Sequence, residues 1–168
     1  DWVVDNMTGG TAEETTVRIE IAEGQLATLP VLLEPDALLV QSKLRGTSLR
    51  VLPNLTPLRE ADVDVLVDGQ ATRLSVLRGT VEPSPGKRLV LSQGSFIIAE
   101  HRVADPLSAA RFRLEGSADA AFALLGQEAF KGAATGPTLP TGPVRGSVVA
   151  NVTVNVPITD KLKPSQID

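Results

Sequence analysis

His101 is the residue best suited to general-base catalysis or metal ligation, and it is the only histidine in the sequence. A catalytic triad or a zinc site needs further side chains that converge on the histidine, and no Ser or Cys signature accompanies it. The chain has no cysteine, which excludes disulfides, thiol catalysis and thiolate metal sites. No phosphate-binding loop, nucleotide fingerprint or nucleophile elbow is present. We therefore expect His101 to be structural or exposed, and we predict a protein that has no catalytic residue, needs no cofactor and is not an enzyme.

Three aspartates, Asp62, Asp64 and Asp68, could bind a hard cation through their carboxylates. They fall on the same face of one predicted strand, where side chains form a line and do not surround an ion. The spacing of an EF-hand loop is also absent. We predict a solvated outer face with no metal site, on which the charges also discourage aggregation between sheets.

The elements that position these residues are strands, because apolar and polar residues alternate along most of the chain. The clearest example is "VRGSVVANVTVNVPI" at 144–158, and "RLVLSQGSFIIAEHRV" at 88–103 is a long strand that bends near Gly94. The predicted strands cover 16–21, 38–52, 61–69, 71–81, 88–103, 108–116 and 144–158. With hairpin turns between them, they predict a mainly β fold of about eight or nine antiparallel strands.

The apolar residues that alternate along these strands share one face. That face is mainly aliphatic, because aromatic residues make up only 3% of the chain. These apolar positions are the candidate site residues, as the lining of an apolar groove: Val17, Ile19, Ile21, Val63, Val65, Val67, Phe112, Leu114, Val148, Ala150, Val152, Val154, Val156 and Ile158. The stretch "VANVTVNV" (149–156) is regular and uncharged, and as an edge strand it would pair edge to edge with another copy.

Two segments depart from the strand pattern. Residues 117–130 have apolar residues at helical spacing after Ser117, a plausible N-cap, and Gly126 predicts that the helix is short. Residues 131–143 are rich in Gly and Pro and predict a surface loop. A Leu-Arg-Gly-Thr motif at 44–47 recurs at 77–80, with looser echoes at 114–117 and 144–147, and these glycines are candidate positions for strand bends.

The length of 168 residues suits a single domain or segment over 1–168, which we expect to be part of a larger chain. A net charge of −4 with scattered basic residues argues against nucleic-acid binding. The longest apolar run, Ala120–Leu125, is six residues, far below the roughly 20 of a membrane span.

One or two short helices cannot cover so many strands. Either the sheet folds over itself into a sandwich or barrel, or it curls into a trough that faces an apolar ligand.

Three segments resemble AsmA-like proteins of the YhdP type, in the order found in that family. "WVVDNMTGGTAEETTVRIEI" is similar to a segment that ends a helix and begins a strand. "RVLPNLTPLREADVDVLVDGQATRLSVLRGTV" is similar to the family's LP-x-L-x-P-L turn and the hairpin after it, and "FRLEGSADAAFALLGQEAF" to its strand and short Ala/Leu helix. The resemblance spans most of residues 2–130.

The resemblance implies a taco-shaped sheet that is one segment of a repeating β-groove, lined with hydrocarbon for phospholipid. It implies a periplasmic location, a parent chain anchored in the inner membrane, and a role in moving phospholipid towards the outer membrane for envelope integrity. Its partners would be phospholipid acyl chains and flanking groove segments of the parent chain. The alternative is a self-covered β-sandwich that acts as an interaction or scaffold module of the bacterial envelope.

Overall fold

The computed structural model describes residues 6–21, 23–24, 37–50, 54–100, 103–104, 106–130, 142 and 144–157. His101, Ile158 and the predicted loop at 131–141 lie outside these residues, as does position 143. The strands are β1 (Met7–Thr8), β2 (Thr11–Ile19), β3 (Leu38–Leu49), β4 (Leu58–Asp68), β5 (Thr72–Ser84), β6 (Lys87–Ile98), β7 (Leu107–Ser117) and β8 (Ser147–Pro157). The helices are α2 (Ala118–Leu125) and the short 3-10 helix η2 (Glu128–Phe130).

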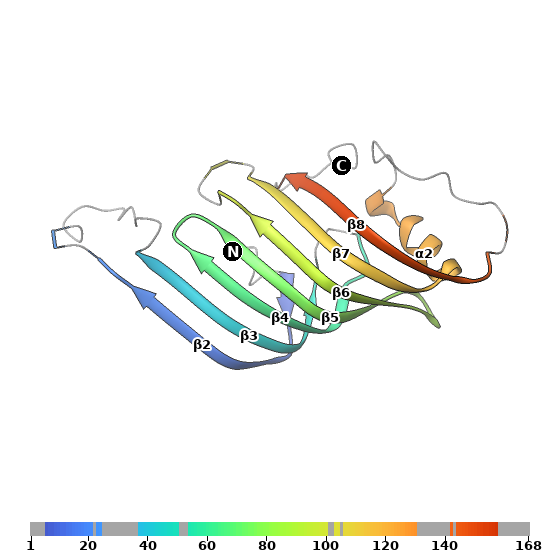
Figure 1. Ribbon diagram of the computed structural model, residues 1–168, viewed down its shortest axis with the longest axis horizontal. Coiled ribbons are helices and arrows are strands. Elements are labelled where there is room, and N and C mark those ends of the chain that lie inside the picture. The colour runs from blue at the N-terminus through green and yellow to red at the C-terminus, as the bar shows by residue number, and fades with distance from the viewer. Residues whose placement is uncertain are drawn as a thin grey trace.

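All the described strands belong to one antiparallel sheet that does not close on itself (Figure 1). From β3 to β8 each strand pairs with the next one along the chain, and β1 and β2 both pair with β3 on its free side. The two edges of the sheet are therefore β2 with β1 on one side and β8 on the other. The prediction of a curved, mainly β, antiparallel sheet with a short helix is confirmed.

Register shifts interrupt five strand pairs. The shift between β5 and β6 lies after Val81, close to their hairpin turn, and the other four lie side by side across the sheet. These four occur after Ala12 between β2 and β3, after Leu44 between β3 and β4, around Asp62 between β4 and β5, and after Ser92 between β6 and β7. An extra residue bends its strand and increases the twist, so a row of such shifts curves the whole sheet. A residue with a positive φ lies at three of these shifts: Gly46 (64°), Glu60 (50°) and Gln93 (51°).

Only two of the four glycines in the repeated Leu-Arg-Gly-Thr motif lie at these register shifts. Gly46 and Gly79 lie in strands β3 and β5 at the shifts, as predicted. Gly116 pairs regularly with Val148 near the end of β7, and Gly146 precedes β8, so those two echoes do not mark bends within strands.

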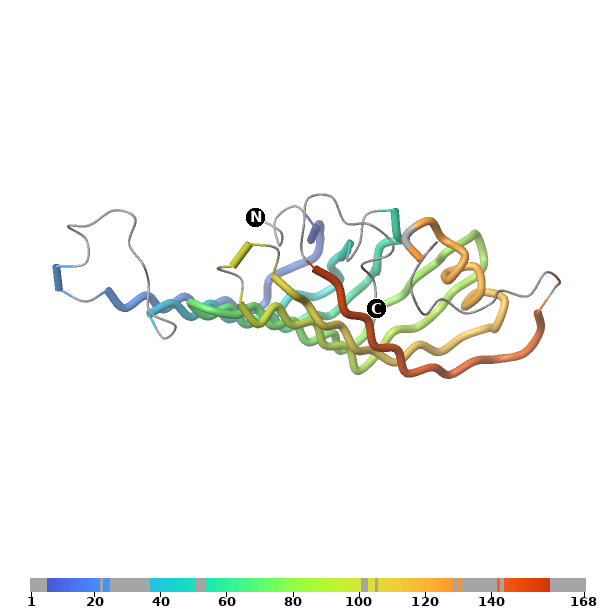
Figure 2. Tube along the Cα trace, turned by 90° about the horizontal axis from the view of Figure 1, so that it is seen from above, coloured from blue at the N-terminus to red at the C-terminus, as the bar shows by residue number. Residues whose placement is uncertain are grey.

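The short helix covers one face of the sheet over β5 to β8, which we call the inner face. Ser117 is its N-cap, as predicted, although its side chain makes no capping hydrogen bond, and the helix is short and ends at Gly126, its C-cap. The helix buries Ala120 and Leu124 against the sheet. In Figure 2 α2, coloured orange, lies by β6 to β8 and at the opposite end of the molecule from β2. No helix among the described residues is long and apolar enough to cross a membrane.

Candidate functional site

The inner face carries uncharged rows of mainly apolar residues that run across the strands. The register places one residue of each strand from β2 to β8 side by side: Val17, Val40, Val67, Thr72, Ile98, Ser108 and Val156. The next row from β3 to β8 contains Ser42, Val65, Leu74, Phe96, Ala110 and Val154. Neither row has a charged side chain, and Ser108 Oγ donates a hydrogen bond to the Val156 carbonyl at 2.8 Å.

Most of the predicted groove residues lie on this face. Val63 has 0% of its surface exposed, Val65, Leu114 and Val156 are buried, and Val67, Phe112, Val148, Ala150, Val152 and Val154 are half-buried. At the β2 edge Val17 and Ile19 belong to the same face but are 58% and 54% exposed, because no described element covers them. Ile21 is exposed just beyond the end of β2.

The inner face also contains residues of β5 and β6 that were not among the predicted lining residues, such as Leu74, Leu89 and Phe96, all of them buried. In β5 their signal was present, since apolar residues alternate in "TRLSV". In β6 it was weaker, because Leu89, Val90 and Leu91 are all apolar and a register shift follows Ser92. After each extra residue the alternation changes phase, so Leu91 and Phe96 face the same side although they are five positions apart.

Beneath α2 the inner face forms an apolar pocket of about 100 Å³. Leu58, Val76, Phe96 and Phe112 line it from the sheet, and Leu124 and Phe130 line it from the helical side. Gly94 also lies in its wall, where a Cβ atom would come within 2.8 Å of Val76 Cβ. The pocket is therefore built from aliphatic and aromatic groups, which suit a hydrocarbon occupant.

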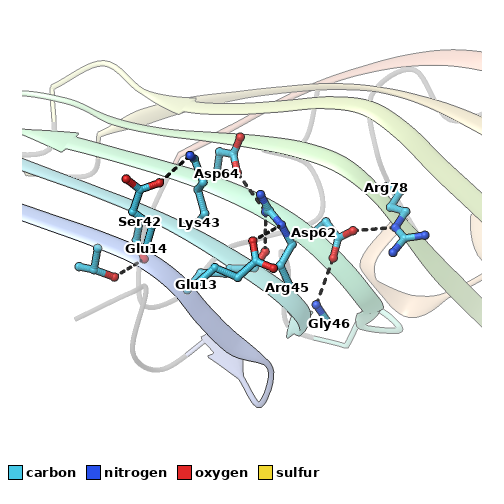
Figure 3. Close-up of polar contacts among 11 residues, drawn as sticks. Glu13, Glu14, Ser42, Lys43, Arg45, Gly46, Asp62, Asp64 and Arg78 are labelled. Carbon is cyan, nitrogen blue, oxygen red and sulfur yellow. Dashed lines mark hydrogen bonds and ion pairs between the residues drawn. The ribbon is translucent and has the colours of Figure 1, made fainter.

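The outer face carries a ladder of ion pairs across β2 to β5 (Figure 3). Lys43 Nζ lies 2.6 Å from Glu14, and Arg45 bridges Glu13 at 3.2 Å and Asp64 at 3.0 Å. The hydrogen bond from Lys43 lowers the pKa of Glu14. These contacts lie along the row of register shifts, so they connect the strands where the backbone ladder is interrupted.

The three predicted aspartates lie on this face, and each accepts a hydrogen bond from an arginine. Asp64 pairs with Arg45, and Asp62 accepts from Arg78 at 2.6 Å and from the Gly46 N–H at 3.2 Å. The Arg78 contact lowers the pKa of Asp62. The aspartates are thus engaged in pairing strands and do not converge on one another.

Asp68 accepts more hydrogen bonds than Asp62 or Asp64. Partial burial opposes its ionisation, but hydrogen bonds from Arg73 and from the Ala71 and Gln70 N–H groups outweigh burial and lower its pKa to about 2. The Arg73 and Ala71 contacts are both 2.6 Å long. Asp68 therefore fixes the tight turn between β4 and β5.

Comparisons with protein-family models, with curated proteins and with solved structures found no match to this chain.

Proposed function

We propose that this chain is a non-enzymatic segment of a β-groove that carries the acyl chains of phospholipids. The observation that supports this most directly is the pair of uncharged rows that cross the open sheet from strand to strand. Strands lie about 4.8 Å apart, so a row over β2 to β8 is about 30 Å long. One leaflet of a bilayer contributes about 15 Å of hydrocarbon, so the row is longer than an acyl chain extended in its leaflet.

The energetics favour such a surface for lipid transfer. Each methylene exposed to water costs about 0.8 kcal/mol, so two acyl chains of ordinary length would cost on the order of 25 kcal/mol to carry through water. An aliphatic face removes most of that barrier without any catalytic group. An open sheet also lets the polar headgroup stay in water.

The resemblance to AsmA-like proteins supports the cellular setting. On this proposal the segment lies in the periplasm, within a parent chain anchored in the inner membrane. Flanking segments continue the groove beyond β2 and β8, and they would cover Val17 and Ile19, which are exposed at the β2 edge. The groove would then carry phospholipid between the inner and outer membranes.

Photolabelling tests this proposal. The chain is mixed with vesicles of phosphatidylethanolamine and phosphatidylglycerol that contain a phospholipid with a diazirine near the end of one acyl chain. After irradiation and digestion, we expect adducts on inner residues such as Phe96, Phe112 and Val154. Adducts spread equally over outer residues such as Thr153 and Arg113, or no adducts at all, would reject the groove.

A scaffold or interaction module of the bacterial envelope is the second candidate, and the uncharged β8 edge favours it. Its partner would add a strand to β8 without contacting the inner face. In that case photolabelling would fail, and substitutions on the outer face of β8 would abolish partner binding.

A further inference from the structure

The helical segment over the pocket is attached at both ends, but in different ways. At its beginning α2 continues directly from β7, and the Ala118 N–H donates to the Gly146 carbonyl at 2.9 Å. Lys87 and Asp119 form an ion pair at 3.5 Å, in which both side chains are more than a third exposed and therefore contribute little. This end is fixed mainly by the covalent chain.

Near its other end the segment is tied to the turn before β4 by the side chain of Gln127, which lies between α2 and η2. Gln127 Oε1 accepts a hydrogen bond from the Thr56 N–H at 2.9 Å, and Nε2 donates to Thr56 Oγ1 at 2.5 Å. Nε2 also lies 3.4 Å from the Pro83 carbonyl in β5. The amide thus uses both its donor and its acceptor on the turn that precedes β4.

The contacts between these two attachments are apolar. Leu124 and Phe130 line the pocket from above, and Leu55 and Thr56, next to the Gln127 contact, line it from the side. Apolar contacts have no fixed direction, so the directional Gln127 contact is the one that fixes how this end of the segment lies over the pocket. The Gln127 contact is therefore placed to influence how far the pocket opens.

We propose that residues 118–130 form a lid, latched by Gln127 to Thr56, that controls uptake of a phospholipid acyl chain into the pocket beneath α2. The inference rests on the proposed function and deepens it, because it names the place where the chain end is held and the contact that regulates access. The occupant is one unbranched chain end, since the pocket is small and its lining almost wholly apolar. The headgroup remains outside on the open sheet.

The first test is Gln127→Ala. It removes the latch, and each net hydrogen bond between neutral groups corresponds to a factor of about two to ten in an equilibrium. We expect uptake of a pyrene-labelled phospholipid from phosphatidylcholine vesicles to become roughly tenfold faster. An unchanged uptake rate in a folded variant would overturn the lid.

The second test closes the lid reversibly. Because the chain has no cysteine, Thr56→Cys with Gln127→Cys creates a unique pair for a cleavable bis-maleimide cross-linker. We expect cross-linking to slow uptake at least tenfold and cleavage to restore it in the same sample, which removes folding as an explanation. The control pair is Arg113→Cys with Asn151→Cys, which are neighbours in register on the outer face, and cross-linking them should leave uptake unchanged.

The outcomes separate the lid from the groove. Equal uptake by the cross-linked and cleaved lid overturns the lid and leaves the groove standing. Failure of every form to take up the lipid overturns the proposed function and the lid together.

Discussion

Val152→Asp on β8 separates an open groove from a closed core. Val152 is half-buried on the inner face, pairs in register with Phe112 and packs against the apolar cluster. Full burial of a valine is worth about 1.5–3 kcal/mol, so loss of a half-buried one costs about 1 kcal/mol. Because β8 is an edge strand, the new carboxylate can recruit water, and we expect a total destabilisation of about 1–3 kcal/mol.

The expected result is a folded protein that has lost its lipid. For a chain of this size 1 kcal/mol lowers Tm by about 2–4 °C, so the variant should melt roughly 3–10 °C below the parent. Circular dichroism measures the melt, and native mass spectrometry after mild extraction measures bound phospholipid. Thr153→Asp, exposed on the outer face next in sequence, is the matched control and should change stability by less than about 0.5 kcal/mol and retain lipid.

Two outcomes would refute this reasoning. Complete unfolding of Val152→Asp would mean that the side chain lies in a closed core, where an unpaired charge costs several kcal/mol. That larger effect is what we expect for Val63→Asp, since Val63 is fully buried. A folded Val152→Asp that still binds lipid would mean that β8 does not line the path.

Three further predictions test the sheet itself. Gly94→Ala should lower the unfolding free energy by about 1–3 kcal/mol in urea titrations, because its Cβ would clash with Val76, whereas Gly142→Ala, with nothing within 4 Å, should be neutral. Asp68→Asn should lower the unfolding free energy by about 1–2 kcal/mol at pH 7 after allowance for screening. Because folding depresses the pKa of Asp68 from 3.8 to about 2, this loss of stability should shrink as pH falls through that range. A loss of stability that does not change with pH would contradict the role of the Asp68 carboxylate in this turn. The uncharged β8 edge should make the protein associate as concentration rises, and Thr153→Lys with Asn155→Lys should suppress this in light scattering; a parent that stays monomeric at all concentrations would show that the edge is covered.

Alternation predicted the sheet well wherever the strands are regular. In β7 and β8 the pairing runs without a shift from Leu107↔Pro157 to Ser117↔Ser147, so a period of two assigns every residue to its face. The position of the helix was equally readable, because it begins after Ser117 and ends before Gly126. Its buried face was less readable: Ala120 and Leu124 are buried, whereas Phe122 is only half-buried.

The rest was hidden by the register shifts and by long-range contacts. Leu58 and Ala61 face the same side because Glu60 takes a positive φ in a strand, a conformation that no propensity predicts for glutamate. The contact of Gln127 with Thr56 joins residues 71 positions apart, and nothing local to either residue signals it. The pocket depends on both features, so its place could not be predicted from the sequence.

The row of register shifts gives a physical reason for a sheet that is curved and open. When two sheets pack face to face, the apolar face of each sheet contacts the apolar face of the other over its whole length. Here the extra residues bend β2 to β6 towards one side. On the other side the ion pairs Arg45–Glu13 and Arg78–Asp62 hold the strands together across the bend. Because α2 covers only the part of the face over β5 to β8, the remaining inner surface at Val17 and Ile19 stays in contact with water. An aliphatic surface that is curved, uncharged and left exposed along one edge gains most from a partner that is itself hydrocarbon or that continues the same sheet, and the proposed groove supplies both.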